Sequence, residues 1–136
     1  MTEREDVEGA RCPCGLPAAY DDCCGRFHRG DKAPPTAELL MRSRYAAYAR
    51  SDAAYLLSSW HPSTRPRRID PDPELRWTRL EIIATTAGGL LDQVGTVSFR
   101  AHHERRGQPA VLTENSRFER HDGRWAYVDA VHASVD

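Results

Sequence analysis

The stretch Cys12-Pro13-Cys14-Gly15 is followed by Cys23-Cys24, with eight residues between Cys14 and Cys23, and the chain has four cysteines in total. Four thiolates in tetrahedral geometry form the usual closed structural zinc site, with metal–sulfur bonds of about 2.3 Å. Pro13 and Gly15 favour a tight turn that brings the first two cysteines to one side. The sequence therefore predicts one zinc ion with four ligands, Cys12, Cys14, Cys23 and Cys24.

The alternatives to zinc are a pair of disulfides, a redox or copper site, and unrelated thiols. The segment from Met1 to Arg11 is acidic and polar and contains no apolar signal sequence. We therefore expect a cytoplasmic protein, in a reducing compartment where disulfides are rare. Clustered cysteines in such a compartment are more often metal ligands, which favours zinc. His28, four residues after Cys24, is a reserve ligand or an outer-shell partner.

Composition limits the classes of partner. The 136 residues include 19 basic and 20 acidic side chains, so net charge gives no general attraction to nucleic acid or membranes. The uncharged apolar stretch Ile82 to Leu91 is far shorter than the ~20 residues of a membrane-spanning helix. The length suits one ordinary core with a small metal-stapled appendage. We expect a disordered tail over 1–10, a zinc knuckle over 11–32 and an α+β domain over 33–136.

Two helices are predicted after the knuckle. Thr36 is a good N-cap for a helix that runs to about Arg50. Its apolar face carries Leu40, Met41, Tyr45 and Tyr48, with Arg44 among them. Ser51 is the expected cap of a second, shorter helix from Asp52 to about Trp60. His61-Pro62 ends it, because a residue before proline avoids the helical region.

Four strands complete the predicted fold. Alternating apolar and polar residues indicate strands over 75–87, 93–104, 110–120 and 124–132. Asp122-Gly123 is a strong hairpin signal between the last two. The fold class is therefore α+β, with helices packed on a curved antiparallel sheet.

Strand alternation also places two carboxylates on faces that should be buried. Residues of one parity share a face of a strand, and the apolar sets of the third and fourth strands contain Glu114 and Asp129. A buried carboxylate without a partner is costly. Arg44 is the one charge on the apolar face of the first helix, so we expect it to contact Glu114 or Asp129.

These charges have two interpretations. One is a structural ion pair that holds helix against sheet. The other is a polar-lined pocket of about 300 Å³ or more inside the cone. Its candidate residues are Arg44, Tyr48, Trp60, His61, Glu114, Trp125 and Asp129. His61 is more simply interpreted as a structural histidine at a helix end.

Several motifs resemble those of a known family. The spacing Cys-x-Cys, eight residues, Cys-Cys resembles the SEC-C motif, a zinc-binding element also found in the SecA translocation ATPase. The resemblance extends to the bacterial YchJ-like family through Tyr20, His28, Gly30, the run 36–45, Trp60-His-Pro62 and the run 123–127. It covers nearly the whole chain. It implies an N-terminal SEC-C element followed by a nuclear-transport-factor-2-like α+β cone, and it implies no particular reaction.

Two functions are compatible with these features. The first is an interaction or adaptor module that uses the zinc knuckle to bind a protein partner, since SEC-C elements in translocation proteins dock a chaperone and the ribosome. The alternative is a small-molecule-binding protein or an enzyme that uses the pocket. No residue combination matches ketosteroid isomerase or scytalone dehydratase, two enzymes of the same fold, so no catalytic residue is assigned. A third possibility is that the knuckle merely covers one end of the domain.

Overall fold

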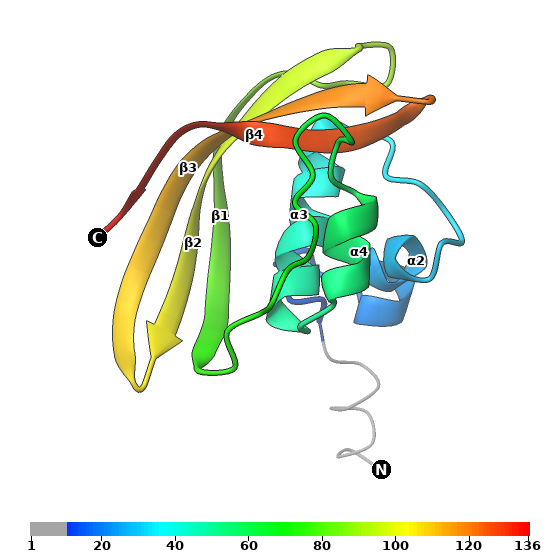
Figure 1. The fold of residues 1–136 in the computed structure, drawn as a ribbon. Helices are drawn as coiled ribbons and strands as arrows, with labels where there is room; N and C mark the ends of the chain where they lie inside the picture. The colour runs from blue at the N-terminus through cyan, green and yellow to red at the C-terminus, as the bar shows by residue number, and fades with distance from the viewer. Residues whose placement is uncertain (1–10) are drawn as a thin grey trace.

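The computed structural model describes residues 11–136 (Figure 1). Two short helical segments come first, η1 (Tyr20–Asp22) and α2 (Cys24–His28), followed by helices α3 (Ala37–Ala49) and α4 (Ala53–Ser58). Four strands then follow: β1 (Leu75–Ala87), β2 (Val94–Arg105), β3 (Gln108–His121) and β4 (Arg124–Val135). The predicted tail over 1–10 lies outside the described residues. No helix within 11–136 is long and apolar enough to cross a membrane.

The strands form one antiparallel sheet in the order β1-β2-β3-β4, which confirms the predicted α+β class. The β3–β4 turn has two residues with positive φ, Asp122 at 53° and Gly123 at 80°. Arg106 and Gly107 make the same kind of turn between β2 and β3, with φ of 53° and 79°. Such turns match the right-handed twist of the strands. The resulting sheet curves around α3 (Figure 1).

The helices begin where polar side chains cap them. The Thr36 side chain accepts a hydrogen bond from the Leu39 N–H at 3.2 Å, as an N-cap does. The predicted cap of α4 was wrong by one residue. Asp52 accepts from the Tyr55 N–H at 3.0 Å, whereas Ser51 has a φ of 57° and lies in the link between the helices.

Helix α4 ends earlier than the sequence predicts because its last residues pair with β4. The Tyr127 N–H donates to the Ser59 carbonyl at 2.9 Å, and the His61 N–H donates to the Tyr127 carbonyl at 2.7 Å. Trp60 thus leaves the helix and forms a parallel bridge with Tyr127. This connection fixes the end of α4 against the free edge of β4.

The main core lies between α3 and the concave face of the sheet. Leu40 and Tyr45 of α3 pack against Val97, Phe99 and Phe118, and all five side chains are buried. The helical spacing of the first two and the strand alternation of the others explain why these faces meet. Burial of this apolar surface is the main favourable term in folding the cone.

Strand β4 contains two irregularities that reverse the predicted side-chain parity. Tyr127 is paired with Phe118 but Asp129 with Arg117, so Val128 is an extra residue in β4. A bulge of this kind turns the following side chain to the other face. Asp129 consequently forms a bidentate ion pair with Arg117 at 2.7 and 2.9 Å, with both side chains nearly half exposed. The prediction that Asp129 faces the helices was wrong.

The N-terminus of α3 is joined to the β1–β2 hairpin by close backbone contact. The Ala37 N–H donates to the Gly88 carbonyl at 2.9 Å. A Cβ atom added to Gly95 would lie 2.5 Å from Gly88 Cα and 2.7 Å from Gly88 N. A side chain at position 95 would therefore displace backbone that holds α3 against the sheet.

We predict that Gly95→Ala lowers the free energy of unfolding by about 3 kcal/mol, because backbone atoms must move to admit the methyl group. Gly107→Ala is the matched control. Gly107 has a φ of 79° and nothing within 4 Å of an added Cβ, so only the backbone conformation opposes it, at about 1 kcal/mol. Urea unfolding of both variants measures the difference. An equal loss at the two positions would contradict the proposed contact.

Candidate metal centre and cone pocket

The four cysteines form one compact, buried cluster. Their sulfur atoms all lie within 4.8 Å of one another, and each residue is at most 3 % exposed. The Sγ atoms of Cys14 and Cys23 are 3.7 Å apart. A tetrahedron with metal–sulfur bonds of about 2.3 Å has sulfur–sulfur edges of about 3.8 Å. The spacing and the donor atoms therefore fit a metal ion, and all four cysteines are free thiols rather than disulfides.

Local backbone structure brings these cysteines together. The Gly15 N–H donates to the Cys12 carbonyl at 3.1 Å, and Gly15 has a φ of 96°, a conformation that glycine adopts without strain. The Cys12 N–H donates to the Ala18 carbonyl at 2.9 Å and closes the loop. Cys23 and Cys24 follow at the start of α2. The turn at Gly15 positions Cys12 and Cys14, and the start of α2 positions Cys23 and Cys24, so the four thiols meet in one place.

The thiols affect one another's ionisation. The interaction with Cys12, followed by burial among the other sulfur atoms, raises the pKa of Cys14 to about 12. The pKa of Cys24 is raised as well, chiefly by its contacts with Cys12 and Cys14. A second thiolate beside a first is unfavourable when no cation is present. This donor set is therefore suited to a cation that balances several thiolates.

His28 connects the knuckle to α3 and does not belong to the sulfur cluster. Its Nε2 lies 2.8 Å from the Ser43 carbonyl and its Nδ1 lies 2.6 Å from the Tyr20 hydroxyl. Because a carbonyl only accepts, Nε2 carries the proton and Nδ1 accepts from Tyr20. Both ring nitrogens are thus occupied. This geometry argues against His28 as a reserve ligand. Its role as an outer-shell partner stays a prediction, because its hydrogen bonds reach Tyr20 and Ser43 rather than a cysteine.

The knuckle is also attached to α3 directly. The Arg42 Nη1 donates to the Cys14 carbonyl at 2.8 Å. The cysteines pack against Ala46, which is fully buried. On the next turn, the Arg50 guanidinium lies 3.9 Å from the centre of the Tyr20 ring. The metal centre is therefore built into the back of α3, opposite the sheet.

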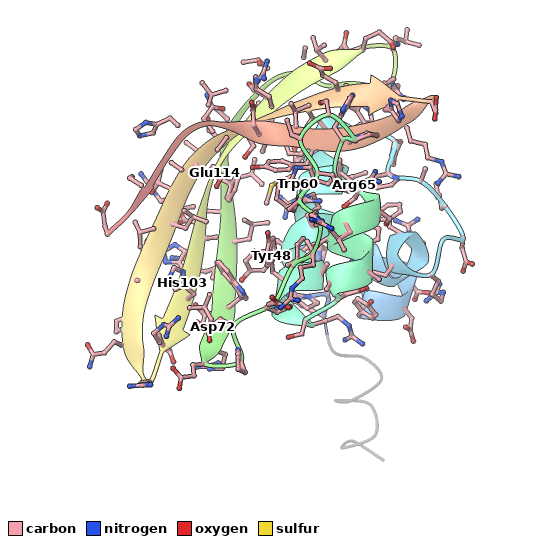
Figure 2. The ribbon with its side chains drawn as sticks, in the orientation of Figure 1. Tyr48, Trp60, Arg65, Asp72, His103 and Glu114 are labelled. Atoms are coloured by element: carbon pink, nitrogen blue, oxygen red, sulfur yellow. The ribbon has the colours of Figure 1, made fainter. Side chains whose placement is uncertain are left out.

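A pocket of about 210 Å³ lies between α3 and the sheet, smaller than the 300 Å³ that the sequence predicts. Three predicted residues line it: Arg44, Tyr48 and Glu114. Tyr48 projects from α3 toward the concave face of the sheet, where Glu114 lies on β3 (Figure 2). The other lining residues are Met41, Tyr45, Trp77, Phe99, Ala101, Leu112 and Tyr127.

Four predicted residues lie outside this lining. Trp60 stacks on the Arg44 guanidinium, 4.9 Å from its ring centre. His61 accepts a hydrogen bond from the Ser63 N–H at 3.1 Å. Trp125 belongs to the core, where its Nε1 donates to the Pro35 carbonyl at 3.2 Å. Asp129 faces outward because of the bulge in β4.

Arg44 is buried in the cone, but its predicted ion pair was wrong. The residue is 3 % exposed and forms no ion pair with a carboxylate among residues 11–136. Its Nη1 donates instead to the Leu56 carbonyl at 2.8 Å and to the Ser59 hydroxyl at 2.7 Å. The negative end of the α4 dipole and the Ser59 hydroxyl thus stabilise the charge in place of a carboxylate. Burial lowers the pKa of Arg44 from its usual value. The guanidinium still keeps its proton, because arginine is not deprotonated in proteins.

Aromatic rings enclose this cation. The guanidinium carbon lies 4.5 Å from the centre of the Tyr127 ring and 4.9 Å from that of Trp60. A cation against desolvated aromatic faces is stabilised by about 2 kcal/mol. The Tyr127 hydroxyl in turn donates to Glu114 at 3.4 Å. Burial, with the Glu114 carboxylate close by, raises the pKa of Tyr127.

Trp77 and Tyr127 are the main pocket residues that sequence reasoning missed as site residues. Trp77 is half-buried on β1, with its ring centre 5.9 Å from those of both Tyr45 and Tyr48. Its parity on a predicted strand was the signal that could have identified it. Tyr127 shares its strand parity with Trp125, which the sequence assigned to the pocket, and that parity could have identified it.

A second, open depression of about 620 Å³ lies between α2, α4 and the β3–β4 turn, and we call it the basic groove. Four cationic side chains and two carboxylates line it: Arg29, Lys32, Arg65 and Arg124, with Asp52 and Asp122. Phe27, Tyr55 and Trp60 contribute aromatic surface. The groove therefore joins the knuckle to the cone and carries a net positive charge.

Comparisons with known proteins agree with this architecture. Residues 36–130 match the family model described as "YchJ, middle NTF2-like domain". A UPF0225 protein of Streptomyces avermitilis is 58 % identical over 120 residues, which cover 88 % of this chain and 83 % of the relative. A UPF0225 protein of Streptomyces coelicolor is 57 % identical, over 87 % of this chain and 92 % of its own length.

Two solved structures share the fold. The solution structure of a SEC-C motif containing protein from Rhodopseudomonas palustris has a TM-score of 0.77 and 33 % identity, over 88 % of this chain and 95 % of that one. The crystal structure of a SEC-C motif containing protein from Psychrobacter arcticus has a TM-score of 0.74 and 25 % identity, over 90 % and 83 %. The chain therefore belongs to the YchJ-like UPF0225 family, with an NTF2-like cone preceded by a four-cysteine cluster of the SEC-C kind.

Proposed function

We propose that this protein is a cytoplasmic zinc-binding interaction module. The observation that supports zinc is the group of four buried sulfur atoms within 4.8 Å of one another. Soft thiolates in tetrahedral arrangement select zinc among common cellular metals. Four protein ligands leave no open position for a substrate, so the bound ion supplies structure rather than catalysis.

The zinc centre shapes a docking surface in this proposal. The basic groove is bounded on one side by α2, which begins at Cys24, and on the other by α4 and the β3–β4 turn. Lys32 and Arg124 line it and form no ion pair among the described residues. The excess of cationic side chains and the aromatic surface favour an acidic protein segment with apolar side chains.

Zinc removal tests the first part. We expect one zinc per chain in the purified protein and loss of that zinc in Cys14→Ser, because three thiolates hold the ion less tightly. Residues 11–32 have little apolar core of their own, so their amide protons should exchange faster while the cone stays protected. Elemental analysis and hydrogen exchange measure the two effects.

His28→Gln is the matched control for the zinc experiment. Both His28 nitrogens bond to Tyr20 and Ser43 rather than to the cluster, so this variant should keep its zinc. Unchanged zinc content in Cys14→Ser would contradict the cysteine site. Loss of zinc in His28→Gln would show that the histidine is a ligand.

A defined peptide tests the basic groove. A fluorescent peptide of alternating glutamate and leucine should bind, and the double variant Lys32→Glu, Arg124→Glu should weaken it at least about ten-fold, since each exposed charge contributes up to about 1 kcal/mol. Arg67→Glu is the control, because Arg67 is exposed and lies outside the groove. Equal weakening by the control, or no binding by the unaltered protein, would contradict the groove as a docking site.

The cone pocket supports a second candidate function, binding of a small molecule. The supporting observation is a partly open pocket of about 210 Å³ that combines aromatic walls with Arg44 and Glu114. Apolar pockets with a few convergent polar groups are the usual form of a ligand site. The volume is below the usual range, which favours a ligand with a single ring.

Small aromatic compounds test this candidate by NMR. We expect the Trp77 indole and the Ala101 methyl signals to shift on addition of such compounds, because both residues line the pocket. Ala101→Met should abolish the shifts by filling the space. Ala84→Phe, on an exposed position of β1, should preserve them. Shifts that survive in Ala101→Met would place binding elsewhere on the protein.

A further inference from the structure

Arg44 brings unused hydrogen-bonding capacity into the cone pocket. A guanidinium carries five N–H donors, and the hydrogen bonds of Arg44 to other described residues all come from Nη1. Nε and Nη2 therefore have no acceptor among residues 11–136. The buried side-chain polar atoms that are fully occluded and unpaired in this range are Trp60 Nε1 and Asn115 Oδ1. The free donors of Arg44 thus keep access to the pocket that Arg44 lines.

This charge has no carboxylate in direct contact, and Glu114 is the carboxylate that lines the same pocket. Arg44 is 3 % exposed and forms no ion pair with any described carboxylate. A buried charge without an opposite charge is unfavourable. The α4 carbonyl and the two aromatic rings offset part of that cost. An anion that accepted hydrogen bonds from Nε and Nη2 would satisfy the remaining donors of Arg44 and balance its charge.

Glu114 forms the second polar point of the same pocket. Its Oε2 accepts hydrogen bonds from the Ser116 hydroxyl at 2.5 Å and the Tyr127 hydroxyl at 3.4 Å. Its Oε1 has no donor among the described residues. A carboxylate oxygen accepts hydrogen bonds and repels anions. The pocket therefore accommodates a single negative charge at Arg44 and a donor group at Glu114.

Flat apolar walls lie between these two points. Tyr48 and Trp77 touch each other at a tilt of 52°, with ring centres 5.9 Å apart, and form one wall. Phe99 of β2 and Leu112 of β3 line the pocket as well. A volume of about 210 Å³ is the volume that about seven water molecules occupy in liquid water. Such a space holds one aromatic ring with small substituents and excludes larger ring systems.

We propose that the cone pocket binds a small aromatic monocarboxylate that carries a hydroxyl or amino donor at the opposite end of its ring. The inference rests on the small-molecule function proposed above. The carboxylate pairs with the planar donors of Arg44, which match its geometry. The ring packs against Tyr48 and Trp77, and the donor group reaches Glu114. Dianions such as phosphate are disfavoured by Glu114.

Matched probes test the inference on the unaltered, zinc-loaded chain. 4-Hydroxybenzoate should bind at least about ten-fold more tightly than its neutral analogue 4-hydroxybenzyl alcohol, because only the former pairs with Arg44. It should also bind more tightly than benzoate, which lacks the donor for Glu114. Titrations followed at the Trp77 indole signal give the three dissociation constants.

Variants test whether Arg44 causes the preference for the acid over the alcohol. Arg44→Met should remove the preference for the carboxylate while the alcohol still binds, and Arg100→Met, at an exposed position outside the pocket, should leave it unchanged. Equal affinities for acid and alcohol in the unaltered protein would overturn the inference but leave small-molecule binding intact. No shift with any probe would overturn both. The comparison of probes needs no variant, so it holds even where Arg44→Met fails to fold.

Discussion

Helix α3 is packed on two sides at once, and the rest of the molecule depends on this arrangement. Leu40 and Tyr45 face the sheet, while Ala46 faces the cysteine cluster. Three consecutive side chains extend the contacts to separate neighbours. Arg42 bonds to the knuckle, Ser43 to Tyr55 of α4, and Arg44 to the end of α4. The short knuckle has no apolar core of its own, so it is held in place by packing on α3. The knuckle in turn covers the side of α3 that does not face the sheet.

The parts of the fold that follow local rules could be predicted from the sequence. Thr36 caps α3 as expected, and the first strand has the predicted limits, Leu75 and Ala87. Helical spacing and strand alternation are properties of neighbouring residues, so they can be seen without tertiary contacts. The cysteine cluster was equally visible, because cysteines this close together in a chain are most often metal ligands.

The misplaced residues depend on contacts that sequence patterns do not contain. Asp129 turned outward because Val128 bulges, and nothing in the alternation of β4 marks an inserted residue. Arg44 was recognised as a buried charge, yet a backbone carbonyl and a hydroxyl satisfy it rather than a carboxylate. His28 has the spacing of a ligand, but Tyr20 and Ser43 occupy both nitrogens. In each case the competing partner lies far away along the chain or is a backbone atom.

The two candidate sites share the residues that hold the end of α4 in place. Arg44 contributes to the cone pocket, and its cation lies against the ring of Trp60, which lines the basic groove. Ser59 joins them, because its hydroxyl accepts from Arg44 and its carbonyl accepts from the Tyr127 N–H of β4. Coupling between sites requires an element whose arrangement both ligands influence. In this fold that element is the segment from Leu56 to Trp60. An anion at Arg44 would bind the same guanidinium that donates to Leu56 and Ser59, and a segment in the groove would contact the Trp60 ring.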